Sequence, residues 1–343
     1  MRLGLILAVL LAFLSPAQAH IASDFDLYLK SERGQHHSKD SFVGDPAWVD
    51  AEANPRFGEA AEEYKAGNYG NAARLLPPLA EEGNVKAQLL LGMLLHGGLG
   101  VERDVAQGIS LIERAADQGL STAKLQLAFV HLRRGEEDLG FQLLEQIANE
   151  GHVFAQIYLG VLYAPAMSDG PGHEKKSFDW FLKAAEAGDT FAMGQVAERY
   201  FTGVGDTFDE AEVEPDIVEA VRWGLAAADL NDPGGQFVLG WIYTRACSLE
   251  EKWTNLEKGV ALFRQAAEQG HVRAQNRLAS AYRHGNGVTK NLVTAYMWAK
   301  LTDRVPGFFS KVSDLASEMT PEQIAKGEQR AREWLEEHGP DSP

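Results

Sequence analysis

Apolar residues recur along much of the chain at the spacing of an α-helix. In the segment AQIYLGVLY, Ala155, Leu159 and Tyr163 lie four residues apart, so a helix would present all three on one face. A glycine-containing stretch follows, and the next apolar segment, SFDWFLKAAEAG, carries Phe178 and Phe181 on one helical face. The pattern predicts two helices, each with one apolar face, joined by a turn that reverses the chain.

The first helix of this pair contains an apolar residue followed by a small one. That dipeptide recurs at intervals of 32 to 43 residues, a period that is typical of a repeat protein. The copies are Leu91-Gly92, Leu127-Ala128, Leu159-Gly160, Val196-Ala197, Leu239-Gly240 and Leu278-Ala279. A second set of dipeptides near the end of the second helix keeps the same register. These are Ala115-Ala116, Ile147-Ala148, Ala184-Ala185, Ala226-Ala227 and Ala266-Ala267.

Glycine and alanine mark the places where these helices must meet closely. Gly160 has no side chain, which lets a neighbouring helix approach, and Ala116, Ala185 and Ala267 are predicted to lie at close helix contacts. Gly188 is predicted to end a helix, because glycine adopts the left-handed conformation without a Cβ clash. One helix pair cannot bury its own apolar stripe, whereas stacked pairs share a continuous core. The sequence therefore predicts an all-α solenoid of stacked helix pairs.

The recurring pattern AxxxLGxxYxxGxGVxxDxxxAxxWxxxAAxxG resembles the Sel1-like repeat, a relative of the tetratricopeptide repeat. This resemblance implies a right-handed α-solenoid, preceded by a tetratricopeptide-like helix pair at residues 57–83 and followed by a closing helix and tail at 305–343. In the closing helix, Thr320, Pro321 and Gln323 fit a capping box. Six repeats are expected, at residues 83–119, 120–151, 151–188, 188–232, 235–270 and 270–304.

The first residues have the features of a secretory signal. Residues 1–19 begin with a basic residue, continue with an apolar run and end in the small-residue motif Ala-Gln-Ala. We expect cleavage before His20, with an uncleaved anchor as the alternative. Residues 20–56 are polar and without periodicity, and we interpret them as an N-terminal arm. No later stretch is apolar enough to span a membrane, so we expect an exported chain, periplasmic or secreted, with no membrane insertion after cleavage.

The charge of the chain is unevenly distributed. The formal net charge is −17, which disfavours binding to nucleic acid, because that binding needs a Lys- and Arg-rich surface. Residues 270–304 are the exception, since they contain Arg273, Arg277, Arg283, Lys290, Lys300 and Arg304 with Asp303 as the only acidic residue. This basic segment either holds an acidic segment or C-terminal carboxylate of a partner, or forms ordinary solvated helix faces.

Candidate chemistry is sparse in the sequence. No catalytic motif of a known kind is present, and we predict no enzyme activity, no cofactor and no metal site. His36-His37 lack a third ligand, and the acidic segment 205–219 is either a cation-binding loop or a solvated loop. Cys247 is the only cysteine, so the disulfide that some secreted Sel1-like proteins carry in each repeat cannot form. Cys247 is either a small buried residue, a catalytic thiol or one half of an intermolecular disulfide.

A solenoid of this class binds partners along the concave face that its first helices line. With the tetratricopeptide register as a guide, we predict a partner-binding groove with an aromatic centre and a basic end. Its residues are Met93, Phe129, Phe154, Val161, Phe191, Phe201, Phe237, Trp241, Arg273, Arg283 and His284. The alternative for Phe154, Phe191 and Phe237 is packing between repeats. Core positions are expected for Trp180, Trp223 and Trp298.

The resemblance also suggests a function. It implies an exported scaffold or adaptor that binds a protein or peptide in its groove, in envelope assembly or signalling regulation. One alternative is a periplasmic immunity protein that neutralises a secreted phospholipase effector. Another, from a different class, is a hydrolase that acts on the cell wall.

If residues 1–19 are cleaved on export, the mature chain begins at His20. N-terminal sequencing of the protein from the envelope fraction is expected to read His20-Ile21-Ala22. A bulky residue in an Ala19→Leu variant should slow the cleavage, because the site requires a small residue there. An intact Met1 in protein recovered from the cytosol would contradict the prediction.

Overall fold

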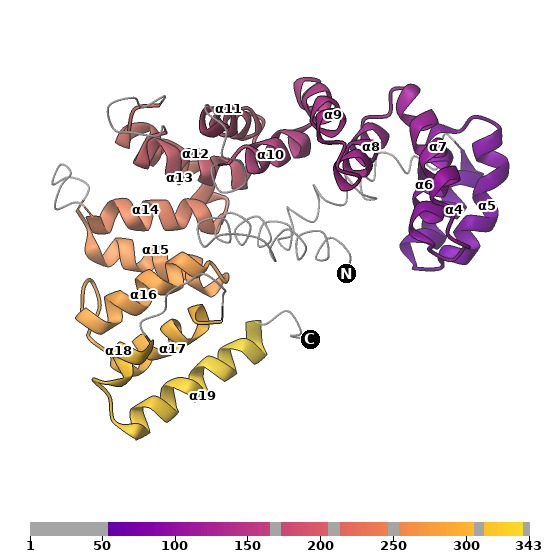
Figure 1. The fold of residues 1–343 in the computed structure, drawn as a ribbon. Coiled ribbons are helices and arrows are strands. Elements are labelled where there is room, and N and C mark those ends of the chain that lie inside the picture. Colours follow the sequence, from indigo (N-terminus) through magenta and orange to yellow (C-terminus); the bar gives the residue numbers. More distant parts are fainter. Residues whose placement is uncertain (1–53, 165–172, 205–212, 246–253, 305–311, 339–343) are drawn as a thin grey trace. The chain divides into compact units, whose positions relative to one another are not determined.

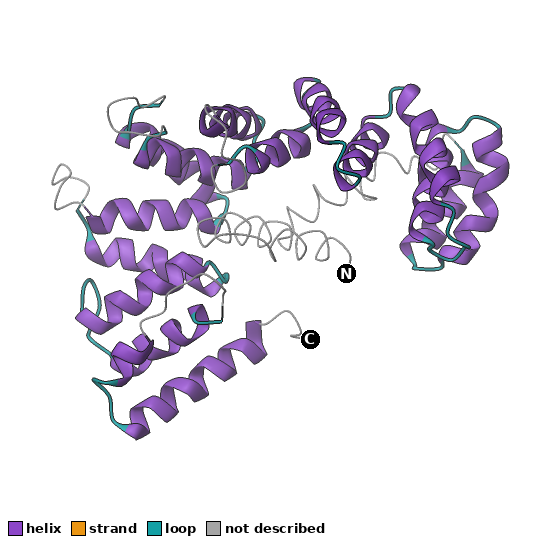
Figure 2. Cartoon of the chain, in the orientation of Figure 1, coloured by secondary structure: helices purple, strands orange, loops and turns teal. Residues whose placement is uncertain are grey.

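The computed structural model describes residues 54–164, 173–204, 213–245, 254–304 and 312–338. Helices make up these residues almost entirely, and the predicted all-α fold is confirmed (Figure 1, Figure 2). Within the described residues the only β-type pairing is an isolated antiparallel bridge between Val204 and Val213. The helices are α4 (Pro55–Lys65), α5 (Tyr69–Glu81), α6 (Val85–Gly97), α7 (Val105–Asp117), α8 (Ser121–Arg133), α9 (Glu137–Asn149), α10 (Val153–Leu162), α11 (His173–Glu186), α12 (Thr190–Thr202), α13 (Ile217–Asp229), α14 (Pro233–Arg245), α15 (Leu256–Glu268), α16 (Val272–His284), α17 (Leu292–Thr302), α18 (Val312–Ala316) and α19 (Pro321–His338).

The described residues form two compact units that divide inside α10, after Leu159. The first unit contains α4 to α9, and the second contains α11 to α19. Consecutive helices pack in pairs: α4 with α5, α6 with α7 and α8 with α9 in the first unit, and α12 with α13, α14 with α15 and α16 with α17 in the second. Neighbouring pairs also touch, for example α5 with α6 and α13 with α14, so stacked pairs share their apolar faces.

The two helices of a pair cross at small residues. A Cβ atom on Gly92 of α6 would lie 2.7 Å from the carbonyl oxygen of Gly108 in α7, which is too close for non-bonded atoms. A Cβ atom on Gly160 would lie 2.8 Å from the ring of Phe181, so the close approach predicted at this glycine is confirmed. Larger side chains at these positions would force the paired helices apart.

The turns between pairs combine a left-handed glycine with a capping residue. Gly188 has φ +96° and Gly270 has φ +87°, so the predicted helix end at Gly188 is confirmed. The next residue then caps the following helix: Asp189 accepts a hydrogen bond through Oδ1 (2.8 Å) and His271 through Nδ1 (3.2 Å), each from the backbone N–H three residues later. A turn of few residues is therefore enough to end one helix and start the next.

A buried glutamine ties the start of a first helix to the end of the preceding second helix. Its side-chain amide donates to a backbone carbonyl in the last turn of that helix, which also accepts from the N–H of the glycine that follows the helix. The bonds run from Gln88 to Ala80 (3.0 Å), from Gln156 to Ala148 (2.9 Å) and from Gln275 to Ala267 (3.2 Å). This geometry explains the Ala-Gln dipeptide that recurs in the sequence.

Several local predictions can be checked directly. The capping box is confirmed, since Thr320 N–H donates to Oε1 of Gln323 (2.9 Å) and Gln323 N–H donates to the Thr320 hydroxyl (3.3 Å). The residues expected in the core are buried, namely Trp180, Trp223, Trp298, Ala116, Ala185 and Ala267. Helix α4 begins at Pro55, within the segment expected to be an arm, because the side chain of Asn54 caps it.

Other predictions fall outside the described residues. These concern the signal at residues 1–19, the arm up to residue 53, His36-His37, residues 205–212 of the acidic segment, and Cys247. Among the helices that the structure describes, none combines the length and apolar character needed to cross a membrane.

The close crossing of α6 and α7 makes Gly92 sensitive to a single methyl group. Gly92→Ala should lower the free energy of unfolding by about 1–3 kcal/mol, because the new Cβ meets the backbone of α7, which cannot move aside, as well as the side chain of Ile112. Gly70→Ala in α5 is the matched control, since its Cβ would lie at an ordinary 3.5 Å from the nearest atom. It should be neutral or stabilising by up to about 1 kcal/mol.

The measurement is urea unfolding followed by circular dichroism, with hydrogen exchange in α6 and α7 as the local readout. Equal stability of the two variants would mean that α6 and α7 do not cross at Gly92.

Candidate partner-binding surface

In the second unit, α12, α14 and α16 are each the first helix of a pair, and together they bring aromatic and arginine side chains close to one another. We name the group formed by Phe201 of α12, Trp241 and Arg245 of α14, and Arg277 of α16 the aromatic–arginine surface. These side chains are half-buried or exposed. They come from three consecutive repeats, so their proximity depends on the stacking of the helix pairs.

Trp241 lies at the centre of this surface, and two other aromatic rings pack against it. Its ring packs edge-on against Phe201, with 5.2 Å between centroids, and lies 5.7 Å from Phe237. Phe237 is 1% exposed and stacks on His271 at 4.8 Å. Trp241 is therefore half-buried on a rigid aromatic base, and part of its ring stays accessible.

Two arginines flank the tryptophan ring. The guanidinium carbons of Arg245 and Arg277 lie 5.5 Å and 5.1 Å from the Trp241 centroid, within the range of cation–π attraction. Partial desolvation lowers the pKa of Arg277, and repulsion from Arg245 and Arg273 lowers it further. Arg277 forms no ion pair with any described residue. A nearby anion would relieve this concentration of positive charge.

An ion pair between α12 and α16 lies beside the surface. Arg273 donates through both Nη atoms to the carboxylate of Glu198, with Nη2 2.6 Å from Oε2. Both side chains are mostly buried, 17% and 19% exposed, and Arg273 also lies over the ring of Phe237 at 4.4 Å. The bidentate geometry fixes the distance between repeats that are separated by another helix pair.

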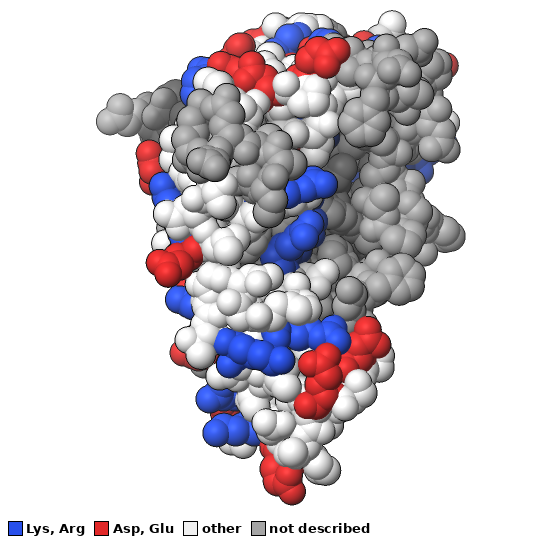
Figure 3. All heavy atoms as spheres, turned by 90° about the vertical axis from the view of Figure 1, so that its left-hand side faces the viewer, with Lys and Arg blue, Asp and Glu red and all other residues white. Residues whose placement is uncertain are grey.

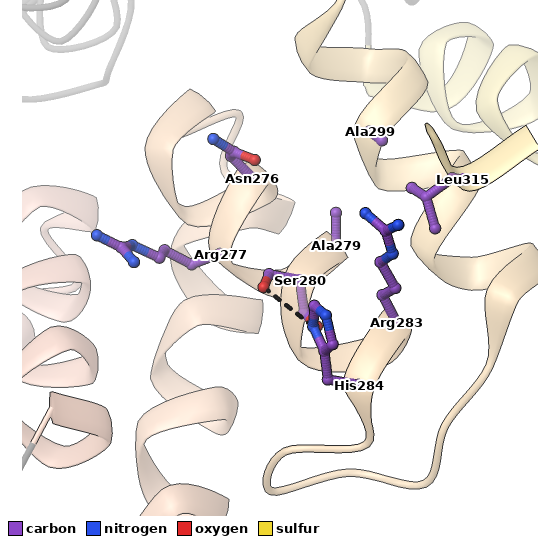
Figure 4. A pocket seen from close by; sticks show the side chains of 8 residues that line it. All are labelled: Asn276, Arg277, Ala279, Ser280, Arg283, His284, Ala299 and Leu315. Atoms are coloured by element: carbon purple, nitrogen blue, oxygen red, sulfur yellow. Dashed lines mark hydrogen bonds between the residues drawn. The ribbon is translucent and has the colours of Figure 1, made fainter. Parts of the chain in front are cut away.

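A hollow of about 180 Å³ adjoins the surface, between α16, α17 and α18. Figure 4 shows its lining, with Arg277 extending from its edge toward α14. Polar side chains surround a floor of buried apolar ones. The lining residues are Asn276, Arg277, Ala279, Ser280, Arg283, His284, Ala299 and Leu315.

Arg283 and His284 are already engaged at the rim of this hollow. Arg283 donates from Nε (3.0 Å) and Nη2 (2.5 Å) to Oε1 of Glu318, and these bonds hold the pKa of Glu318 below its usual range. Nδ1 of His284 lies 2.9 Å from the carbonyl oxygen of Ser280, so this nitrogen carries the proton. Among the described residues, Nη1 of Arg283 and the side chain of Asn276 make no hydrogen bond.

The structure separates the sequence-predicted groove residues into three groups. Phe201, Trp241 and Arg273 meet at or beside the aromatic–arginine surface, and Arg283 and His284 line the adjoining hollow. Met93 is half-buried in the first unit, where it packs on the core of that unit. The remaining five are at most 8% exposed and are core residues of the chain, namely Phe129, Phe154, Val161, Phe191 and Phe237.

Two members of the surface, Arg245 and Arg277, were not among the predicted groove residues, although the predicted basic segment includes Arg277. Arg277 follows Arg273 by four residues and so shares its helical face, a signal that the sequence does contain. Arg245 ends α14 and reaches Trp241 one turn back, which is also visible in the spacing. Figure 3 shows basic side chains across the middle of one face and acidic side chains at its upper and lower ends. The described residues contain no cluster of three or more metal-ligating side chains.

The repeats also match known proteins. A sequence model of the Sel1 repeat matches residues 85–120, 153–189, 190–232, 235–271 and 272–301, which together exceed half of the chain. Residues 121–152 lie between matched ranges, and the helices α8 and α9 form a pair there.

Two curated relatives share the repeats at low identity. A chitin synthase regulator of Saccharomyces cerevisiae is 28% identical over 215 residues, which cover 59% of this chain and 30% of that protein. A component of an ERAD-associated E3 ubiquitin-protein ligase of Arabidopsis thaliana is 24% identical over 302 residues, which cover 80% of this chain and 47% of the relative. The chain thus spans less than half the length of these relatives.

A solved structure supports the fold. A protective antigen of uropathogenic Escherichia coli superposes with a TM-score of 0.64 at 23% identity, covering 93% of this chain and 69% of the antigen. At this identity the likeness concerns the fold alone. With repeat matches over more than half of its residues and the same helix pairs in its structure, the chain belongs to the Sel1 repeat family.

Proposed function

We propose that this protein is a non-catalytic scaffold that binds a protein or peptide partner through the aromatic–arginine surface. The observation that carries the proposal is the Trp241 ring, which is supported from below by Phe237 and flanked by Arg245 and Arg277. Tryptophan and arginine are the residues that most often anchor protein interfaces. A ring already fixed by its neighbours loses little conformational freedom on binding.

The chemical character of the surface favours binding over catalysis. Guanidinium groups stay protonated at physiological pH, and aromatic rings transfer no protons, so these groups attract and orient but do not serve as acids or bases. Desolvated rings beside cationic groups suit a partner that offers apolar and acidic side chains.

The relatives support a protein partner. One is a regulator of chitin synthase and the other is a component of a ubiquitin ligase, and both roles involve other proteins. We extend this role to the present chain at the level of protein binding. The capture experiment described below tests which protein is the partner.

We place the scaffold in the bacterial envelope, after export. The secretory features of residues 1–19 support this location, and the absence of later sequence stretches of similar apolar character fits an exported chain. In that compartment the role would be assembly of envelope components or regulation of envelope signalling.

Truncation of the central ring tests the function. Trp241→Ala should reduce capture of the partner from envelope extract by about thirtyfold, which corresponds to about 2 kcal/mol for an interface anchor. Leu225→Ala on α13 is the control, since Leu225 is also apolar and is 40% exposed but lies outside the surface. Quantitative mass spectrometry of tagged wild type and both variants gives the ratio. A secreted phospholipase among the Trp241-dependent proteins would instead indicate an immunity role.

Stability measurements separate an anchor from a core residue. Phe237→Ala should cost about 3–5 kcal/mol of folding free energy, because it leaves a cavity in a buried aromatic cluster. Trp241→Ala should cost clearly less, because part of its ring is already accessible to solvent. If Trp241→Ala melts as early as Phe237→Ala and still captures every partner, the surface is structural only.

A further inference from the structure

The hollow beside the aromatic–arginine surface has more hydrogen-bond donors than acceptors to pair with them. Within the described residues, Arg277 has no ion pair, Nη1 of Arg283 makes no hydrogen bond, and neither does the Asn276 side chain. Glu318 engages Arg283 only through Nε and Nη2. One side of the Arg283 guanidinium is thus available for a second acceptor.

The floor of the hollow is apolar and rigid. Ala279, Ala299 and Leu315 are each at most 3% exposed and come from three different helices, so the floor is part of the packed core. The volume of about 180 Å³ is several times the roughly 30 Å³ that a water molecule takes up in the liquid. A space of this size and polarity suits a short side chain with apolar methylenes and a charged end.

We propose that this hollow receives an acidic side chain, a glutamate or aspartate, from the partner segment that docks on Trp241. The inference rests on the proposed function, because Arg277 belongs to both places: it lies over the Trp241 ring and also lines the hollow. A segment that crosses Arg277 meets the aromatic ring on one side and the hollow on the other. The partner is therefore a protein with an acidic residue close to an aromatic or apolar one.

The charges of the site support this occupant. Arg277 lines the edge of the hollow and Arg283 its rim, and Glu318, bonded to Arg283, is the one carboxylate paired with either of them among the described residues, which leaves an excess of positive charge. Hydrogen bonds between guanidinium and carboxylate are stronger than neutral ones, and Asn276 can donate a further bond. The methylenes of a glutamate would contact the apolar floor, whereas a phosphate or sulfate has no apolar part to place there.

A set of labelled peptides tests the inference on the full mature chain. Each is a C-terminally amidated peptide of serine and glycine, labelled with fluorescein at its N-terminus, with one phenylalanine and one glutamate at varied spacing. Fluorescence polarisation measures the dissociation constant. At the best spacing, the glutamate peptide should bind at least tenfold more tightly than its glutamine counterpart, and added salt should weaken only the glutamate peptide.

Substitutions of the arginines test whether the preference for the glutamate peptide arises in the hollow. Arg283→Gln should weaken the glutamate peptide about tenfold and leave the glutamine peptide nearly unchanged, since the coupling exists only with the carboxylate. Arg277→Gln also alters the aromatic–arginine surface, so it should weaken both peptides, and the glutamate peptide more. Lys326→Gln on α19 removes the same charge from an exposed residue away from the hollow and should change neither peptide. Circular dichroism confirms that each variant is folded.

Several outcomes would overturn the inference. Equal affinity for the glutamate and glutamine peptides would do so, as would failure of every peptide to bind. A glutamine peptide with a free C-terminus that binds as well as the glutamate peptide would assign the hollow to a terminal carboxylate, and displacement by free glutamate at equal concentration would assign it to a small metabolite. If Trp241-dependent capture persists while the Arg283 variant captures normally, the proposed function stands and this inference fails.

Discussion

The close crossing of two helices at small residues is the constraint on which the other features of this fold depend. In α14 and α15, a Cβ atom on Gly240 would lie 2.9 Å from the carbonyl oxygen of Gly259, so the two backbones are in direct contact. This contact fixes the distance and angle within the pair. It also brings the end of the second helix near the start of the next pair, where Gln275 can bond to the carbonyl of Ala267. The repeat is therefore a rigid unit that stacks in one way.

Regular stacking places equivalent positions in register, but it does not make them equivalent in exposure. The residue after the small crossing residue is Phe129 in α8, Val161 in α10, Trp241 in α14 and Ser280 in α16. Phe129 and Val161 are buried, Trp241 is half-buried and Ser280 is exposed. The binding surface arises where a large ring at this position packs on a buried neighbour and lies within cation–π range of two arginines, and where a hollow lies between α16 and α18.

The second unit also buries charge, which costs free energy unless polar partners replace water. Arg199 is 7% exposed and donates to the carbonyl oxygen of Gln195 (3.1 Å) and to the hydroxyl of Ser177 (3.2 Å), and its guanidinium lies 4.8 Å from the Phe181 centroid. Ser177 in turn donates to Gly160 at the helix crossing (2.6 Å). Together with the Glu198–Arg273 pair, this network links α10, α11, α12 and α16 through polar contacts.

The sequence by itself determined the helix pairs, their register, the left-handed turn at Gly188 and the capping box at Thr320 and Gln323, because each depends on residues close in the chain. Which predicted groove residues face solvent was decided only by the tertiary structure. Phe191 and Phe201 are both aromatic residues of α12, yet Phe191 is buried and Phe201 is partly exposed. Exposure depends on which side chains of other repeats cover a residue, and a local pattern carries no information about those distant neighbours.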